Sequence, residues 1–233
     1  GTFEMGSNNG DANEKPVHTV RVSSFELMKT EVTVGQYRKC VEAGSCTTPG
    51  AGTTCNWGRE GREDHPINCV SWFQLNTFAK WVGGRLPSES EWEYAARNRG
   101  KKVSYPWGDQ RPSCEYAVMS DRGLGCGKAM TSPICSKPQG ITEQGLCDMV
   151  GNVREWTRDE FEASYIGSPS NGNARCSSST CNEERTDLSR VVRGSSWLDG
   201  ISSKTSIRAT YRDSRAPTSR GNGVGGRIAK SMH

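Results

Sequence analysis

The sequence predicts an α+β fold in which ordered loops outnumber helices and strands. Helical periodicity is confined to the part of the chain before Gly100, and short alternating apolar stretches occur towards both ends. The remainder is interrupted by many of the 27 glycines and 10 prolines. No internal repeat divides the 233 residues, so we expect one domain over residues 1–233.

The first elements lie between Lys15 and Ala43. The stretch KPVHTVRVSSFELMKTEVT alternates apolar and polar residues, which predicts one or two strands with one buried face. Thr33 then caps a predicted helix over residues 34–43, in which Val34, Tyr37 and Cys40 recur at helical spacing. Residues 46–68 consist largely of turn-forming residues and predict a long loop.

Two further helices are predicted before Gly100. Ser71 caps the first, which ends at Gly83, and Ser88 with Glu91 forms a capping box for the second. The apolar stripes that these helices bury are Trp72, Leu75, Phe78, Ala79 and Val82 in the first and Trp92, Ala95 and Ala96 in the second. The tryptophans assigned to the core are Trp72, Trp81 and Trp92.

Little after Gly100 is periodic. Short strands are predicted near residues 191–197, 207–211 and 224–229, and we expect them to contribute to a central antiparallel sheet. Loops with turn residues connect them.

The ten cysteines fall into five neighbouring pairs along the chain. No C-x-x-C motif occurs, which argues against a zinc ribbon or a thioredoxin-type site. Local disulfides and an oxidising, extracytoplasmic location (periplasmic, cell-surface or secreted) are therefore predicted, although the sequence leaves the connectivity open. The predicted pairs are Cys40 with Cys46, Cys55 with Cys69, Cys114 with Cys126, Cys135 with Cys147, and Cys176 with Cys181.

Charge and motifs exclude several classes of function. The formal net charge of +4 is spread along the chain, so no nucleic-acid partner is expected. No apolar run approaches the roughly 18 residues of a membrane helix, so no membrane insertion is expected. Dinucleotide, P-loop and G-x-S-x-G motifs are absent, and the three histidines are far apart in sequence.

Eight motifs occur in a fixed order along the chain. They are GTFEMGS, EVTVGQYRKC, HPINCVSW, GGRLPSESEWEYAAR, YPWGD, DMVGNVREW, RVVRGSSW and RATYRDSRAPTSRGNGVGGRIA. In this order they resemble the formylglycine-generating enzyme, or sulfatase-modifying factor, domain family over essentially the whole chain. The resemblance implies a disulfide-bonded, loop-rich variant of the C-type lectin fold.

The stretch CDMVGNVREW, residues 147–156, combines two acids with a Gly-Asn turn. The resemblance implies a structural calcium ion here, bound by the side chains of Asp148 and Glu155 and the carbonyls of Gly151 and Val153, and calcium prefers such oxygen ligands. The alternative is that Glu155 caps the turn or pairs with an arginine. A second calcium site of the family falls on Ala117 and Val118, which puts that site in doubt.

The copper chemistry of the enzyme is not expected in this chain. The resemblance places the two copper-binding cysteines at Asp199 and Lys204, and a further family cysteine at Ala209. Cu(I) requires soft thiolate ligands, which a carboxylate and an ammonium do not replace. No copper is therefore expected as a cofactor.

These departures favour a non-catalytic, calcium-stabilised module that binds a protein or peptide over its C-terminal loops, and the arginines there favour an anionic ligand. The residues predicted to line that surface are Trp197, Asp199, Lys204, Arg208, Arg212, Arg215 and Arg220. Charge reversal at Arg212 is expected to weaken binding and leave the fold intact. The alternatives are a solvated basic surface, a copper-independent oxidase or tailoring enzyme of the pyoverdine-maturation type, and a formylglycine-generating oxidoreductase.

Overall fold

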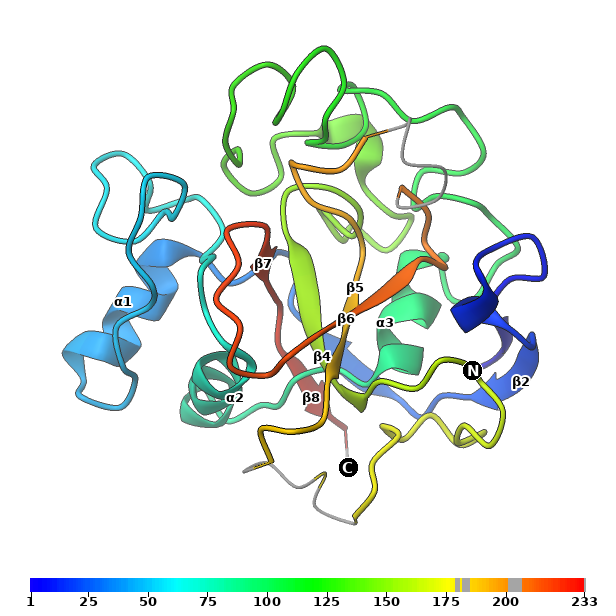
Figure 1. The fold of residues 1–233 in the computed structure, drawn as a ribbon. Helices are drawn as coiled ribbons and strands as arrows, with labels where there is room; N and C mark the ends of the chain where they lie inside the picture. Colours follow the sequence, from blue (N-terminus) through cyan, green and yellow to red (C-terminus); the bar gives the residue numbers. More distant parts are fainter. Residues whose placement is uncertain (179–180, 182–184, 201–206, 233) are drawn as a thin grey trace.

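Three helices and several short sheets make up the regular part of the fold, and loops make up the rest (Figure 1). The computed structural model describes residues 1–178, 181, 185–200 and 207–232. The helices are α1 (Val34–Glu42), α2 (Trp72–Trp81) and α3 (Glu89–Ala96), and two single 3₁₀ turns are η1 (Ala12–Glu14) and η2 (Pro138–Gly140). None of the described helices combines the length and hydrophobicity needed to cross a bilayer.

Each helix begins at the predicted cap. The side chains of Thr33, Ser71 and Ser88 each accept a hydrogen bond from the backbone N–H three residues further on. In all three the side chain at that third position bonds back to the cap residue, which completes a capping box. The predicted helix positions are confirmed.

A four-stranded mixed sheet lies at the centre of the molecule, in the order β6-β5-β4-β7. Its strands are β4 (Arg154–Glu160), β5 (Arg190–Arg193), β6 (Arg212–Arg215) and β7 (Val224–Gly225). The β4–β5 and β5–β6 pairs are antiparallel, but β7 runs parallel to β4. The expectation of an antiparallel sheet is therefore confirmed for three strands and wrong for the fourth.

Several strand boundaries differ from the predicted ones. The strand expected at 207–211 is absent from the described residues 207–211, and β6 begins immediately after them. The strand expected at 191–197 ends at Arg193, and the one at 224–229 is split between β7 and β8 (Ala229–Ser231). β4 was not predicted, because the sequence REWTRDE has no apolar alternation, although six of its seven residues are buried.

Two small antiparallel sheets join segments that are distant in sequence. β1 (Thr2–Met5) pairs with β2 (His18–Arg21), and β3 (Phe25–Leu27) pairs with β8. The second pairing places the end of the chain beside its N-terminal part (Figure 1).

The main apolar core lies between α1, α2 and the sheet. Trp72 and Trp92 are fully buried, as predicted. Trp81 and Val82 are 41% and 47% exposed, so their assignment to the core was wrong. Trp81 is the last residue of α2 and Val82 caps its C-terminus, which lies at the surface.

All five predicted disulfides are present, and no cysteine remains free. Each bridge closes a loop of 5 to 14 residues, so the bridges stabilise loops rather than connect distant elements. Such a density of disulfides is typical of proteins that mature outside the cytoplasm.

Candidate functional site

The turn predicted to bind calcium runs directly into β4. Asp148 and Asn152 adopt the left-handed backbone conformation, with φ of 55° and 61°, and Gly151 has φ of 96°. A Cβ on Gly151 would lie 2.9 Å from backbone atoms of Val118, so only glycine fits there. The Asn152 N–H donates to the Val118 carbonyl at 2.8 Å, which fixes the turn against that segment.

Glu155 is fully buried and paired with an arginine. Its two carboxylate oxygens accept from Nε and Nη2 of Arg227 at 2.8 and 2.7 Å, and the indole of Trp92 donates to it at 2.8 Å. The arginine pairing left open by the sequence is thus present. Calcium at Glu155 remains a prediction, and a bound ion would share these oxygens.

A third carboxylate, Glu31, was missed by sequence reasoning. It is fully buried and accepts from Asn152 Nδ2 at 2.7 Å and from the Val153 N–H at 3.0 Å. Burial, followed by the charges of Asp148 and Glu155, raises the pKa of Glu31 well above its usual value. Glu31 lies in the polar stretch KTEVT, so nothing in the sequence indicates that this acid is buried.

Three buried carboxyl groups lie around the turn, and burial disfavours their charged forms. Asp148 is 7% exposed and accepts from the Cys135 N–H at 2.6 Å, and burial raises its pKa. Arg227 is the fully buried cation that acts on all three. Within the described ranges no three acidic, histidine or cysteine side chains converge as a metal cluster, so a calcium site here would depend on backbone carbonyls as well.

A second constellation surrounds Arg154 at the start of β4. The guanidinium binds Asp199 through Nη2–Oδ1 at 2.6 Å and Nε–Oδ2 at 3.1 Å, and it also pairs with Asp213. Ser196 donates to Asp199 Oδ2 from both its N–H and its hydroxyl at 2.8 Å. Burial would raise the pKa of Asp199, but the hydrogen bonds and charge of Arg154 hold it below its usual value.

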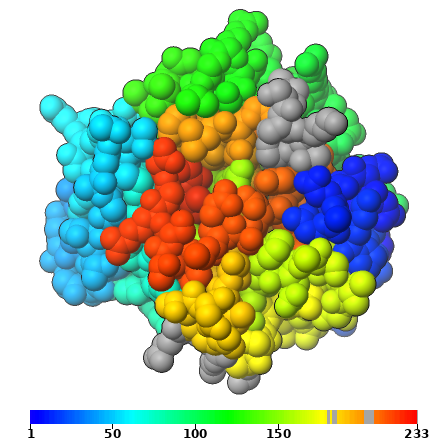
Figure 2. All heavy atoms as spheres, in the orientation of Figure 1, coloured from blue at the N-terminus to red at the C-terminus, as the bar shows by residue number. Residues whose placement is uncertain are grey.

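The Arg154 group lies close to the surface beside charged and aromatic side chains. Arg215 pairs with Asp213 at 2.8 Å, and its side chain is 39% exposed. The ring of Tyr211 lies 5.6 Å from the Arg154 guanidinium carbon. Figure 2 shows a small hollow between the orange and red segments on this face, with the yellow-green of β4 at its floor.

The structure divides the residues predicted to bind a ligand. Trp197 is 2% exposed and donates its indole N–H to the Asn222 carbonyl, so it belongs to the core. Arg208 forms a double hydrogen bond with the buried Glu14 at 2.6 and 2.7 Å. Arg220 is exposed and Arg215 is partly exposed. Lys204 lies outside the described residues.

Arg212 is in the wrong place for ligand binding. It is 2% exposed, and its Nε and Nη2 donate to Glu89 at 2.7 and 2.8 Å. Charge reversal there would place a carboxylate against the buried Glu89, so we now expect it to destabilise the fold rather than leave it intact. The many arginines in this part of the sequence suggested a ligand-binding surface, but Arg212 forms a buried ion pair with Glu89.

Comparison with known proteins extends over the whole chain. Residues 1–232 match the family model described as a sulfatase-modifying factor enzyme 1-like domain. The chain is 30% identical to the formylglycine-generating enzyme of Streptomyces coelicolor, over 98% of this chain and 86% of that protein.

Two further comparisons cover different shares of the matched proteins. The chain is 30% identical to the hercynine oxygenase of Mycobacterium tuberculosis, over 62% of this chain and 40% of that protein. The structure of PvdO from Pseudomonas aeruginosa superposes with a TM-score of 0.79 and 26% identity, covering 100% of this chain and 92% of that one.

Proposed function

The chain belongs to the sulfatase-modifying factor enzyme 1-like family, and we propose that it is a copper-free member that binds a protein or peptide. The observation that carries the copper-free part of this proposal is the pairing of all ten cysteines in five disulfides. A Cu(I) site needs thiolates, and here every thiol is already consumed. Asp199, where the resemblance expects a copper ligand, is instead bound by Arg154.

The ligand surface in this proposal is the face around Arg154, Asp213 and Arg215. Within the predicted set, Arg215 and Arg220 lie at the surface, and Arg215 would exchange its ion pair with Asp213 for one with the ligand. Arginines present fixed donor pairs to carboxylates, which suits an acidic or C-terminal group of a peptide. The aromatic ring of Tyr211 supplies an apolar contact beside them.

Calcium is the proposed structural ion of the turn 147–156. The support is chemical: two acids and turn carbonyls form an oxygen donor set, and a bound cation would stabilise the charged forms of carboxyl groups whose pKa burial raises. Asp148, Glu155 and the carbonyls of Gly151 and Val153 would hold the ion. The five disulfides support a location in the periplasm, on the cell surface or outside the cell.

The test of copper independence is a turnover assay on the purified chain. We expect no formylglycine when the chain is incubated with a sulfatase-derived cysteine peptide, copper and air, and mass spectrometry of the peptide measures this. The control is Asp199→Cys with Lys204→Cys, which restores both thiols. Conversion of the peptide by the unaltered chain would overturn the proposal.

Binding is tested with peptides selected from a random display library. We expect Arg215→Glu to weaken a selected peptide about tenfold in calorimetry, because a charge-assisted pair is replaced by repulsion. The matched control is Arg21→Glu, an exposed arginine of β2. Equal affinity in both variants would place the ligand elsewhere.

The alternative proposal is a copper-independent tailoring enzyme. It is favoured by the whole-chain similarity to PvdO at 26% identity. The mass of a captured ligand distinguishes the two: release of an unchanged molecule supports a binding module, and a changed mass supports an enzyme.

A further inference from the structure

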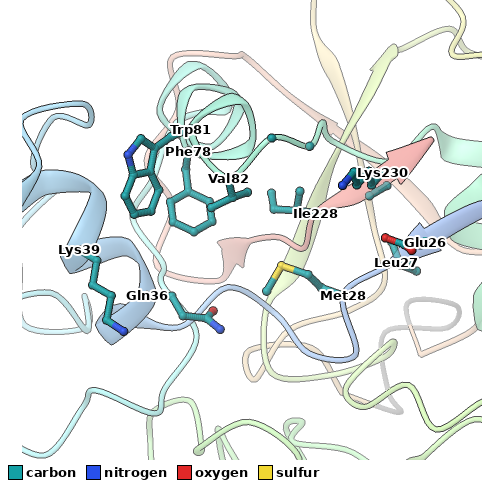
Figure 3. Close-up of a pocket in the computed structure, with 13 residues that line it drawn as sticks. Glu26, Leu27, Met28, Gln36, Lys39, Phe78, Trp81, Val82, Ile228 and Lys230 are labelled. Atoms are coloured by element: carbon teal, nitrogen blue, oxygen red, sulfur yellow. The ribbon is translucent and has the colours of Figure 1, made fainter. Parts of the chain in front are cut away.

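A groove separate from the Arg154 face opens between the end of α2 and the β3–β8 sheet. It encloses about 440 Å³, which is within the size range of small-molecule sites. Figure 3 shows the side chains of Phe78, Trp81 and Val82 on one side and Met28 on the other, with Ile228 between them. We propose that this groove binds a free aliphatic carboxylate with a medium-length chain.

The floor of the groove is formed by residues of the main apolar core. Phe78 and Ile228 belong to that core and are 2% and 5% exposed, and Met28 packs against it. Trp81 and Val82 extend this apolar surface outward, at 41% and 47% exposure. An alkyl chain laid along these side chains would remove apolar surface from water, which is the favourable term for such a ligand.

One end of the groove is lined by two side chains that can donate hydrogen bonds, Gln36 and Lys39. Gln36 and Lys39 lie three residues apart on α1, so their side chains share one face of the helix. The Gln36 oxygen accepts from the Thr33 N–H at 2.9 Å in the capping box, which fixes the orientation of its amide. Figure 3 shows the Lys39 ammonium and the Gln36 amide at the same end.

Both side chains are exposed, and in the described part of the chain these donors have no protein partner. Neither the Gln36 amide nitrogen nor the Lys39 ammonium makes a hydrogen bond or ion pair with a described residue. A carboxylate accepts from both kinds of donor, and its charge matches that of Lys39. This end therefore favours a negatively charged acceptor group.

The opposite end of the groove is electrically balanced. Glu26 and Lys230 lie directly opposite each other in the β3–β8 register, and both line the groove. The excess positive charge of the lining is therefore at Lys39. Because only the end at Lys39 has a net charge, the groove favours an apolar chain with one anionic group over a ligand that is charged at both ends.

The probe is decanoate, with decanol as its uncharged partner, titrated calorimetrically and by the change in tryptophan fluorescence that is lost in Trp81→Phe. We expect saturable binding of one decanoate. Lys39→Met should weaken decanoate about tenfold and decanol hardly at all. Val82→Asp should weaken both, because it places a carboxylate in the groove at an exposed position that the fold tolerates.

The matched control is Lys102→Met, an exposed lysine outside the groove, which should bind decanoate like the parent. Absence of saturable binding, or full affinity of Val82→Asp for decanoate, would overturn the proposal. Equal affinity of the parent for decanol and decanoate would overturn the role of Lys39. A dimer in sedimentation that Val82→Asp dissociates would assign the groove to a second copy of the chain and would also contradict it. None of these outcomes depends on peptide binding at the Arg154 face.

Discussion

Two regions of the molecule are stabilised in opposite ways. The helical region, which comprises α1, α2 and the loop between them, packs around apolar side chains such as Tyr37, Leu75 and Phe78. The charged region, which comprises α3, β5 and β6, contains buried ion pairs. There Arg193 Nη2 lies 2.6 Å from Glu93, and Arg212 makes its double hydrogen bond with Glu89.

The arginines of the charged region are also packed on aromatic rings. The Arg193 guanidinium carbon lies 5.1 Å from the ring centre of Trp92, and that of Arg212 lies 4.4 Å from Tyr165. Tyr165 donates its hydroxyl to Glu89 at 3.1 Å. Burial would raise the pKa of Glu89, but the charges of Arg212 and Arg193 hold it below its usual value.

The difference concerns how each region responds to substitution. A buried ion pair contributes little net stability compared with apolar packing, yet removing one partner leaves an uncompensated charge. An apolar core loses stability in proportion to the volume removed. We therefore expect the charged region to respond abruptly to single changes and the helical region to respond gradually.

The largest effect is expected at Arg212. Arg212→Met should lower the free energy of unfolding by about 3–5 kcal/mol, because Glu89 is left buried without its main partner. Arg215→Met, three residues further along β6, should cost no more than about 1 kcal/mol, since Arg215 is 39% exposed. Urea denaturation of both variants measures the contrast.

A double variant sharpens this comparison. Adding Glu89→Gln to Arg212→Met removes the unpaired charge, so the combined loss should be smaller than the sum of the two single losses. Additive losses would mean that the ion pair does not stabilise the charged region as described.

The matching change in the helical region is Leu75→Ala. Leu75 is fully buried, so we expect a loss of about 2–5 kcal/mol from the cavity. Leu75→Met conserves volume and should cost less than about 1.5 kcal/mol. If the two changes cost the same in denaturant unfolding, packing volume does not control this region.

The disulfide of the long loop should have an intermediate effect. Removing the Cys55–Cys69 bridge as a double alanine variant should cost about 3 kcal/mol, since it closes a loop of sequence separation 14. The Cys176–Cys181 bridge has a separation of 5 and should cost about 2 kcal/mol. A larger loss from the shorter loop in thermal unfolding would contradict this ranking.

The effect expected to be smallest near neutral pH is that of His65, which increases as the pH falls. This histidine is 6% exposed, and burial together with the nearby Arg62 lowers its pKa to about 4. The unfolded chain therefore binds a proton that the folded chain does not, between the unfolded pKa of 6.5 and the folded value of about 4. The contribution of neutral His65 to the free energy of unfolding is fully present above pH 6.5 and is lost as the pH falls through this window.

One pH unit below the unfolded pKa, the loss in the free energy of unfolding is about 1.4 kcal/mol, and it increases further toward pH 4. The difference in unfolding free energy between the parent and His65→Asn, measured from pH 7 to pH 4, isolates it from the carboxylates. A difference that is constant across this range would exclude the effect.

The comparison also explains how much the sequence could predict. In the helical region, Thr33, Ser71 and Ser88 are local caps, and apolar spacing identifies the buried faces. The cysteine pairs were predictable because each bridge is local. These features depend on residues close together in the chain.

The missed features depend on partners far apart in sequence. β4 and β6 are rich in charged residues. The burial of Glu155 in β4 and of Arg212 in β6 follows from contacts with Arg227, 72 residues away, and with Glu89, 123 residues away. Glu31 lies 121 residues from Asn152, to which it bonds. A single sequence does not indicate which distant acid neutralises which arginine, so Arg212 looked like a surface residue.

The central functional claim is that this family member binds calcium and no copper. The most direct measurement is elemental analysis by mass spectrometry of the full chain, after exposure to equimolar calcium and Cu(I) and removal of unbound ions. The account predicts about one calcium per chain and only traces of copper, with calcium lost in Asp148→Asn and retained in the exposed control Asp64→Asn. One copper per chain, with or without calcium, would contradict it.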